Sequence, residues 1–221
     1  MKISEAIKNR KSTRSFLKKD VNFETVQKIL DIARWSASGA NTQPWDVAVV
    51  KGELKDKICN EYINAFKKGK PANMDYKYYP DKWFEPYKER RVKCGFQLYD
   101  ALNIKRQDHE KRKEQWINNY NAFDAPVVLF FFIDPGLQTG SYMDYGMFLK
   151  CIMLAALEQG LGTCPQASLA DYPEIVKKSL KITDEKILLC GMALGYENID
   201  DPVNKYRTPR EGVDNFTKFY E

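Results

Sequence analysis

The spacing of apolar residues divides the chain into helices and strands that alternate along its length. Apolar positions recur at helical spacing from Val26 to Ala33 and from Ile58 to Phe66. The runs 127–133 and 187–194 are apolar without polar alternation, which predicts central strands covered on both faces. The other predicted elements are a strand at 47–50 and helices at 5–9, 90–119 with a break near 103, 145–158 and 172–180. This interleaving predicts an α/β or α+β sheet sandwich.

Two segments depart from this pattern. The helix predicted at 145–158 is apolar on nearly every face, which is typical of a helix buried at a domain centre or at a dimer interface. From Tyr76 to Tyr87, six of twelve residues are aromatic, with two prolines and two lysines among them. A linker rarely carries so many aromatic residues. The segment 67–93 is therefore predicted to be an excursion that either covers an active site or packs on a partner subunit.

Composition indicates one folded domain over residues 1–221. Hydrophobic residues make up 43% of the chain and aromatic residues 13%, which is enough for a packed core. No apolar run approaches the roughly 20 residues of a membrane span, and residues 1–16 lack the apolar run of a secretory signal. We therefore expect a cytoplasmic location and no membrane partner.

The formal net charge of +5 favours anionic ligands. Because acidic residues are interspersed along the chain, an ordinary solvated surface explains this charge as well as an anionic cofactor does. Lysines lie among the aromatic residues of 67–93, but no nucleic-acid-binding motif accompanies them. No nucleic-acid partner is predicted.

The cysteines and the single histidine exclude several kinds of site. The five cysteines are odd in number and show no C-x-x-C spacing, which argues against a disulfide framework and against a metal site. His109, the single histidine, lies in a charged run typical of a solvated helix face. Ser-His and Cys-His nucleophiles and nearly all histidine metal sites are thereby excluded. If the protein is an enzyme, a cofactor is expected to carry the chemistry.

Arg10, Lys11, Ser12 and Arg14 form the first candidate site. In an extended backbone, residues 10, 12 and 14 lie on one face. Two guanidinium groups and a hydroxyl on that face suit a phosphate monoester, which carries about −1.5 to −2 charges. A solvated helix end with cations placed against its dipole is the alternative interpretation. P-loop and G-x-G-x-x-G motifs are absent, so nucleotide binding of those kinds has no support.

The polar loop 36–44 is the second candidate site. Gly39 allows a close backbone approach, and Pro44 favours an extended residue before it. Asn41 and Gln43 each bring a donor and an acceptor, which suit the carbonyl and N–H edge of a heterocyclic ring. An ordinary helix-to-strand connection is the alternative interpretation.

Cationic and nucleophilic side chains also occur in the C-terminal part of the chain. Arg207 and Arg210 either complete a phosphate site or lie on a plain surface. Cys164 lies in the predicted connection 161–167, after the apolar helix. A nucleophile is one interpretation of Cys164, but no histidine is near it in sequence, and cysteine is commonly a core residue.

Taken together, these motifs resemble those of the FMN-dependent nitroreductase family, nearest in pattern to its nitrobenzoate and nitroaromatic reductases. The matching segments cover nearly the whole chain and are RKSTRSF, SGANTQPW, LYDALNIKRQD, APVVLFF, DYGMF, GLGTCPQA and CGMALGYENIDDPVNKYRTPRE. The resemblance implies an α+β fold, a three-layer sandwich with a central, mainly antiparallel sheet flanked by helices. It also implies an intertwined homodimer with two FMN sites at the interface, each built from both subunits.

The resemblance further implies which residues bind FMN. Those implied for the phosphate, the ribityl chain and the pyrimidine end are Arg10, Lys11, Ser12, Arg14, Arg207 and Arg210. Those implied for the ring near N5 are Pro165, Gln166 and Ala167, and those implied to come from the other subunit are Ala37, Ser38 and Asn41. Ala37 departs from the family, which usually has proline at this position.

The implied activity is reduction of nitroaromatic or similar electron-poor acceptors by NAD(P)H in a ping-pong reaction. No side chain is implied as catalytic, because flavin N5 carries the chemistry. Tyr79, Trp83 and Phe84 are the predicted acceptor contacts if the aromatic segment is a lid. Two alternatives stay open. One is FMN-dependent reduction of another acceptor, such as a quinone, an enone or a halogenated aromatic compound, and the other is a flavin-binding protein without turnover.

Overall fold

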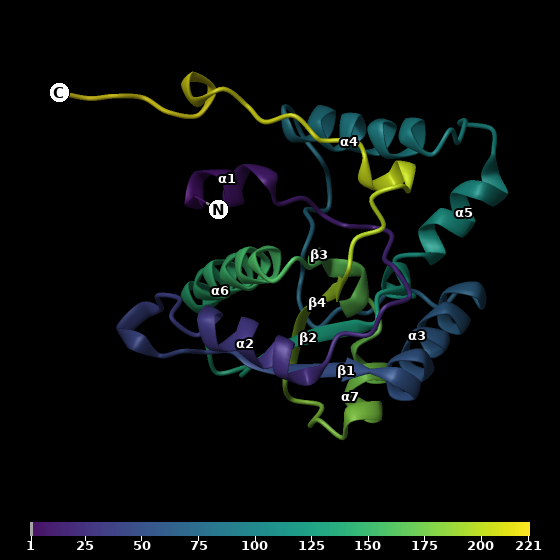
Figure 1. Ribbon diagram of the computed structural model, residues 1–221, viewed down its shortest axis with the longest axis horizontal. Coiled ribbons are helices and arrows are strands. Elements are labelled where there is room, and N and C mark those ends of the chain that lie inside the picture. Colours follow the sequence, from purple (N-terminus) through teal and green to yellow (C-terminus); the bar gives the residue numbers. More distant parts are fainter. Residues whose placement is uncertain (1) are drawn as a thin grey trace.

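The computed structural model describes residues 2–221, which form a four-stranded sheet with helices on both of its faces (Figure 1). The strands are β1 (Asp46–Lys51), β2 (Val127–Ile133), β3 (Gly162–Gln166) and β4 (Ile187–Gly195). The α-helices are α1 (Ile3–Asn9), α2 (Phe23–Ala33), α3 (Gly52–Lys67), α4 (Tyr87–Ala101), α5 (His109–Ile117), α6 (Thr139–Glu158) and α7 (Pro173–Leu180). Short 3-10 helices lie at Gly39–Asn41, Ala122–Asp124, Ala167–Ala170, Pro202–Asn204 and Val213–Asn215.

The two apolar runs form the middle of the sheet. The strand order is β1-β2-β4-β3, and every neighbouring pair is antiparallel. Every residue of β2 is buried, and so is every residue of β4 except Ile187. A strand that is covered on both faces needs no polar alternation, so the prediction of central strands at 127–133 and 187–194 is confirmed.

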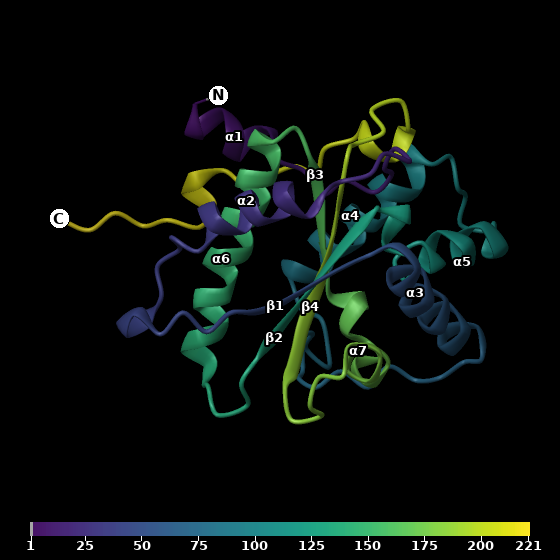
Figure 2. The same ribbon diagram turned by 60° about the horizontal axis from the view of Figure 1, so that its bottom comes forward.

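Alternate residues of β2 point into two separate cores. Val128 and Phe130 pack with residues of α3 and α7 on one face of the sheet. Leu129 and Phe131 pack with residues of α2 and α6 on the other face. Figure 2 shows α2 and α6 on one side of the sheet and α3 and α7 on the other. The predicted three-layer α+β sandwich with a central antiparallel sheet is confirmed.

The helix that is apolar on nearly every face, α6, is buried along one side only. Phe148 and Ile152 are buried against the sheet and α2. Met143 and Met147 are 71% and 40% exposed, so the opposite side of α6 presents apolar side chains to solvent. Neither α6 nor any other helix within residues 2–221 is long and apolar enough to cross a membrane.

After α1, the chain runs extended beside β3. The backbone N–H of Thr13 donates to the carbonyl of Thr163 at 2.9 Å, and Ser12 forms a parallel bridge with Thr163. The buried side chain of Asn204 holds the same segment from the C-terminal part, since its Oδ1 accepts from the backbone N–H of Arg14 at 2.8 Å. The extended backbone predicted for residues 10, 12 and 14 is therefore fixed on both sides.

Two boundaries differ from the predictions. Gly162–Gln166 forms the edge strand β3, where the sequence predicted a connection. Glycine and proline are unfavourable inside strands, and Pro165 is tolerated because β3 lies at the edge of the sheet. In addition, α6 begins at Thr139 rather than near 145. The sequence pattern missed this start because the first turn contains Gly140 and Ser141, which are weak helix formers. The predicted break near 103 is confirmed by the gap between α4 and α5.

Gly162 is expected to be important for stability because it lets residues 12–14 approach β3. A Cβ at residue 162 would lie 2.9 Å from the Cβ of Thr13, closer than side chains pack. We predict that Gly162→Ala lowers the free energy of unfolding by about 1–3 kcal/mol, the usual cost of overpacking. Chemical denaturation measures the change. Gly140→Ala is the matched control, because a Cβ there meets nothing within 4 Å. Equal stability of the two variants would contradict this packing argument.

Candidate functional site

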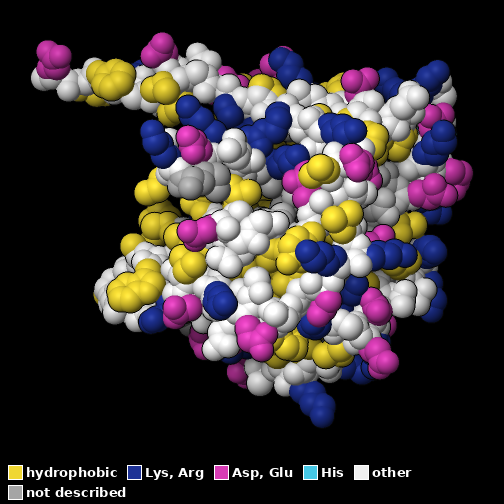
Figure 3. Space-filling view, in the orientation of Figure 1, with side chains coloured by type: hydrophobic (Ala, Val, Ile, Leu, Met, Phe, Trp, Pro, Cys, Tyr) yellow, Lys and Arg dark blue, Asp and Glu magenta, His cyan; other side chains and the backbone are white. Residues whose placement is uncertain are grey.

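Six of the residues predicted to bind a phosphorylated cofactor line one cavity. This cavity, the cationic cavity, has a volume of about 230 Å³ and lies where the end of α1 meets α4 and the segment 203–210. Its lining residues are Arg10, Lys11, Ser12, Arg14, Cys94, Val203, Tyr206, Arg207, Thr208 and Arg210. Figure 3 shows lysine and arginine side chains gathered between α1 and the C-terminal tail. The fold thus brings together cations that are nearly two hundred residues apart in the sequence.

Lys11, Arg14 and Arg207 have partners within the chain. Lys11 pairs with Glu197 at 2.6 Å. Arg207 donates to main-chain carbonyls at the end of α1, where helix carbonyls lack intrahelical partners. Arg14 donates to the hydroxyl of Tyr206 at 3.3 Å. These contacts fix the walls of the cationic cavity.

Arg10 and Arg210 keep donors free for a ligand. Within the described chain, the guanidinium of Arg10 donates only to the thioether of Met153, at 3.8 Å. Arg210 donates to Thr208 and Pro209, its own neighbours along the chain. Neither guanidinium forms an ion pair with a carboxylate of residues 2–221. Each therefore has N–H groups available to an anion.

The cations of this region also destabilise one another. Burial lowers the pKa of the Arg10 guanidinium, and the charges of Arg210 and Arg207 lower it further. The pKa of Lys150 is lowered by burial first and then by Arg10 and Arg210. No aspartate or glutamate is among the residues that line the cationic cavity. A bound dianion would relieve the repulsion between these cations, which makes the cavity suited to a phosphate group.

A second cavity lies between α6, the end of β3 and the start of β4. This tyrosine cavity has a volume of about 330 Å³. Its lining residues are Tyr76, Tyr78, Tyr142, Tyr145, Gly146, Leu149, Pro165, Gln166, Ala167, Leu189 and Cys190. The three residues implied to line a flavin ring, Pro165, Gln166 and Ala167, are thus together at one wall of a mostly apolar cavity.

The first part of the aromatic segment is anchored to the sheet. Asp75 pairs with the buried Lys177 at 2.9 Å and accepts from the backbone N–H of Leu188 at 2.8 Å. The hydroxyl of Tyr76 donates to the carbonyl of Leu189 at 2.7 Å. These contacts place Tyr76 and its neighbours at the start of β4, beside the tyrosine cavity.

Tyr79, Trp83 and Phe84, the predicted acceptor contacts, line neither of these two cavities. Tyr79 lies edge-on to Tyr78 with ring centroids 4.5 Å apart, and Trp83 lies 5.5 Å from Tyr79. Phe84 is exposed. The lid stays a prediction, and the structure adds Tyr76 and Tyr78 as the residues of this segment that reach a cavity.

The polar loop 36–44 lies against α6, and its residues line neither cavity. The backbone N–H of Gly39 donates to the buried carboxylate of Asp144 at 3.2 Å. The assignment of this loop to the FMN of a partner subunit stays a prediction. The three residues concerned are Ala37, Ser38 and Asn41.

The backbone of this loop differs from the prediction made from Pro44. Gln43 has a φ of 48°, so the residue before the proline is left-handed rather than extended. Ala40 and Asn41 also have positive φ, at 49° and 56°. Backbone strain of this kind in non-glycine residues is common at binding sites, where contacts with the surrounding structure maintain the strained conformation. Here the side chain of Ser38 accepts from the backbone N–H of Gln43 at 3.0 Å.

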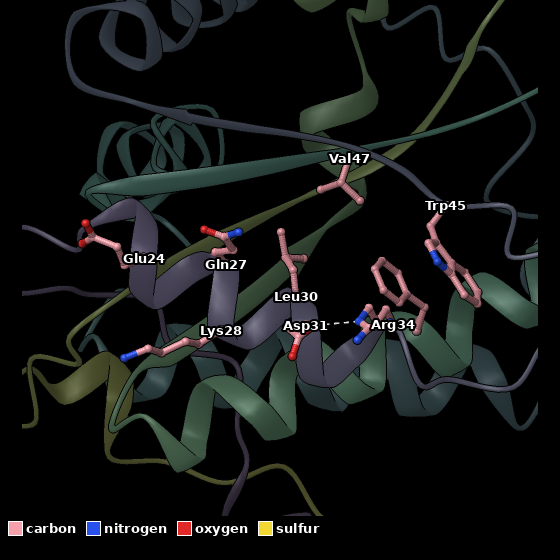
Figure 4. A pocket seen from close by; sticks show the side chains of 9 residues that line it. Glu24, Gln27, Lys28, Leu30, Asp31, Arg34, Trp45 and Val47 are labelled. Atoms are coloured by element: carbon pink, nitrogen blue, oxygen red, sulfur yellow. Dashed lines mark hydrogen bonds and ion pairs between the residues drawn. The ribbon is translucent and has the colours of Figure 1, made fainter.

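A groove of about 750 Å³ between α2 and the start of β1 lacks the predicted cofactor residues (Figure 4). Trp45 stacks on Phe148 in this groove, with ring centroids 4.7 Å apart. At the rim, Asp31 and Arg34 form an exposed ion pair at 2.6 Å. The groove is larger than the other two cavities, and its lining combines apolar side chains with charges of both signs, namely Glu24, Lys28, Asp31 and Arg34.

Cys164 is a core residue. It is buried, and burial raises the pKa of its thiol, so the thiol stays protonated at neutral pH. The structure gives no support to a nucleophilic role for it. Four other residues of the cationic cavity, Cys94, Val203, Tyr206 and Thr208, were not singled out in the sequence. Tyr206 and Thr208 flank Arg207 and were detectable as its neighbours, whereas nothing in the sequence places Cys94 of α4 there.

A protein-family model matches most of the chain. The model described as "Nitroreductase family" matches residues 7–196. The chain belongs to the nitroreductase family. The family resemblance of RKSTRSF, SGANTQPW and the other motifs is thereby confirmed.

Individual relatives cover almost the whole chain. The protein is 36% identical to "4-nitrobenzoate reductase" of Pseudomonas putida over 96% of this chain and 93% of the relative. It is 34% identical to "Chloronitrobenzene nitroreductase" of Comamonas testosteroni over 98% and 96%. The solved FMN and NADPH-dependent nitroreductase NfnB from Sphigopyxis sp. strain HMH has a TM-score of 0.97 at 33% identity, with 100% of both chains covered. FMN-dependent NfnB from Mycobacterium smegmatis, in complex with NADPH, has a TM-score of 0.93 at 29% identity, with 99% and 97% covered.

Cys94 is expected to report on ligand binding, because its exposed thiol lies in the wall of the cationic cavity. We predict that inorganic phosphate slows the reaction of this thiol with a maleimide, since a bound anion restricts access to it. Mass spectrometry of the labelled protein over time measures the rate. Cys94→Ser should remove the phosphate-sensitive labelling, and the buried Cys164 should react only after unfolding. A labelling rate of Cys94 that phosphate leaves unchanged would contradict anion binding in this cavity.

Proposed function

We propose that the protein is an FMN-dependent oxidoreductase that uses NAD(P)H to reduce nitroaromatic or similar electron-poor acceptors in a ping-pong reaction. The observation that carries this proposal is the presence, in one cavity, of two guanidinium groups that have no carboxylate partner among the described residues, those of Arg10 and Arg210. Membership of the nitroreductase family and the FMN and NADPH named for its solved relatives support it.

The donor set of the cationic cavity fits the phosphate end of FMN. Arg10 and Arg210 supply free N–H groups, and Arg207 adds a third positive charge beside them. Charge-assisted hydrogen bonds from guanidinium groups to phosphate oxygens are among the strongest in proteins. The wall residues proposed for the ribityl chain and the pyrimidine end are Lys11, Ser12 and Arg14.

The end of β3 is proposed to hold the ring. Pro165, Gln166 and Ala167 would contact the ring, and they also form one wall of the mostly apolar tyrosine cavity, so that this cavity would lie beside the ring. Bound FMN supplies the redox chemistry, since its ring accepts a hydride from NAD(P)H and passes the electrons to an acceptor. Arg14 would lie beside the pyrimidine end, where its positive charge would stabilise negative charge. The chain needs no nucleophilic side chain for this chemistry, in agreement with the burial of Cys164.

We also propose that the protein is a homodimer in which Ala37, Ser38 and Asn41 of each subunit reach the FMN of the other. Large apolar side chains stand in solvent next to this loop and in the C-terminal tail, which Figure 1 shows extending away from the body. Trp35 is 79% exposed, and Phe219 and Tyr220 are 82% and 85% exposed. Together with the exposed side of α6, they offer the apolar surface that an obligate interface requires.

The aromatic segment is proposed to cover the acceptor. Tyr79 packs on Tyr78, which lines the tyrosine cavity, and Trp83 packs on Tyr79. Phe84, which packs on Tyr87, is the third residue proposed to contact the acceptor. A row of aromatic faces that starts at the cavity suits a flat acceptor ring.

We predict that Arg210→Ala weakens FMN binding about 10- to 100-fold, because it removes charge-assisted hydrogen bonds of roughly 1.5–3 kcal/mol. FMN stoichiometry after gel filtration and a fluorescence titration measure the loss. Arg34→Ala is the control, because Arg34 is an exposed arginine that pairs with Asp31 away from the cationic cavity. FMN retention equal to that of the control would contradict the assignment of Arg210 to the phosphate.

The visible spectrum of the FMN-loaded protein tests the function. Under anaerobic conditions, NADH or NADPH should bleach the flavin absorbance, and nitrobenzene should restore it. If the nucleotides leave the flavin oxidised, the protein is a flavin-binding protein without turnover. If reduced flavin reacts with a quinone but not with nitrobenzene, the acceptor class is different. A protein that does not take up FMN would contradict the proposed cofactor and mechanism.

A further inference from the structure

The tyrosine cavity carries no charged side chain among its described lining residues. Four tyrosines provide much of its wall, and the rest is aliphatic, thiol or main-chain surface together with Gln166. The cationic cavity, by contrast, is lined by five lysine and arginine side chains. The structure thus separates a region that attracts anions from one that offers them no positive partner.

Two of the four tyrosine hydroxyls form hydrogen bonds with the protein backbone. Tyr76 donates to the carbonyl of Leu189 at 2.7 Å. Tyr145 accepts from the backbone N–H of Asp46 at 2.7 Å and donates to the carbonyl of Phe132. These bonds hold the two rings in place, so this part of the cavity wall is rigid.

The other two hydroxyls are available to a ligand. The hydroxyls of Tyr78 and Tyr142 form no hydrogen bond with another residue of 2–221. Tyr142 lies on α6 with its ring 5.7 Å from that of Tyr76, and Tyr78 follows the Asp75–Lys177 ion pair. A phenol hydroxyl donates well to a neutral nitro or carbonyl oxygen.

Size and position suit one aromatic ring beside the proposed flavin ring. The volume of about 330 Å³ is at the lower end of the range for small-molecule pockets. The cavity shares the wall Pro165–Ala167 with the proposed ring position, so its occupant would lie next to the reacting part of the cofactor.

We propose that the tyrosine cavity selects uncharged aromatic acceptors over aromatic carboxylates. This inference rests on the proposed function, because it takes the flavin ring to lie at Pro165–Ala167. A carboxylate in this cavity would lose hydration without gaining a cation, whereas the oxygens of a neutral nitro or carbonyl group are satisfied by a phenol. Sequence similarity does not make this distinction, since relatives named for 4-nitrobenzoate and for chloronitrobenzene are 36% and 34% identical to the chain.

Benzamide and benzoate test the inference without any turnover, because they have nearly the same shape and differ in charge. Calorimetric titration of the oxidised, FMN-loaded protein should show benzamide binding at least about tenfold more tightly than benzoate. Benzoate binding as tightly as benzamide or more tightly, or binding of neither compound, would overturn the inference.

A pair of variants at one position isolates the effect of charge. Tyr142→Lys adds a cation to the cavity, and Tyr142→Gln removes the same ring without adding charge. The ratio of benzoate to benzamide affinity should rise at least about tenfold in the lysine variant relative to the glutamine variant. An equal ratio in the two variants would overturn the inference, provided that both bind FMN and show the circular dichroism of the unmodified protein.

Failure of this inference and failure of the proposed function are distinguishable on the same preparation. If NADPH reduces the bound FMN and benzoate binds more tightly than benzamide, the selection of uncharged acceptors is wrong and the proposed function stands. If NADPH leaves the bound FMN oxidised while benzamide binds more tightly, the charge preference of the cavity stands and the proposed function is wrong.

Discussion

The close contact between residues 12–14 and β3 is the constraint on which the candidate site depends. It exists because residue 162 has no side chain, so that Thr13 occupies the space beside the strand and bonds to Thr163. Asn204 then ties the C-terminal part to the same segment through the backbone of Arg14, 190 residues away in the sequence. The cationic cavity is the space that remains between these tied segments and α4. Its cations therefore meet as a consequence of main-chain packing rather than of attraction between their side chains.

The distribution of charge follows from this arrangement. At the rim, Glu197 neutralises Lys11 and helix carbonyls accept from Arg207, whereas Arg10 and Arg210 have no carboxylate partner among the described residues. Repulsion between these cations lowers the free energy of unfolding, and a bound anion would raise it again by neutralising them. The tyrosine cavity is the opposite case, apolar and uncharged. Such a pair of cavities suits an anionic phosphate group in the first and an uncharged aromatic ring in the second.

The sequence predicted most of this fold, because unbroken apolar runs identify central strands and the alternation of residues 10, 12 and 14 identifies one face. It did not predict β3, whose glycine and proline disfavour strands and whose formation depends on pairing with β4. The assignment of Tyr79, Trp83 and Phe84 as acceptor contacts stays a prediction, and the structure adds Tyr76 and Tyr78 as the residues of this segment that line the tyrosine cavity. An aromatic run without periodicity does not reveal which rings turn inward. The Asp75–Lys177 ion pair anchors the start of this segment to the rest of the fold, and it joins residues 102 positions apart in the sequence.

Comparison of FMN with riboflavin measures what the cationic cavity contributes to cofactor binding, because the two ligands differ only by the phosphate. We expect the protein without cofactor to bind FMN at least about 100-fold more tightly than riboflavin, since only the phosphate would reach Arg10 and Arg210. We also expect that raising the salt concentration weakens FMN binding more than riboflavin binding. Equal affinity for the two flavins would show that the cationic cavity does not hold the phosphate, and would contradict the assignment of Arg10 and Arg210 to FMN.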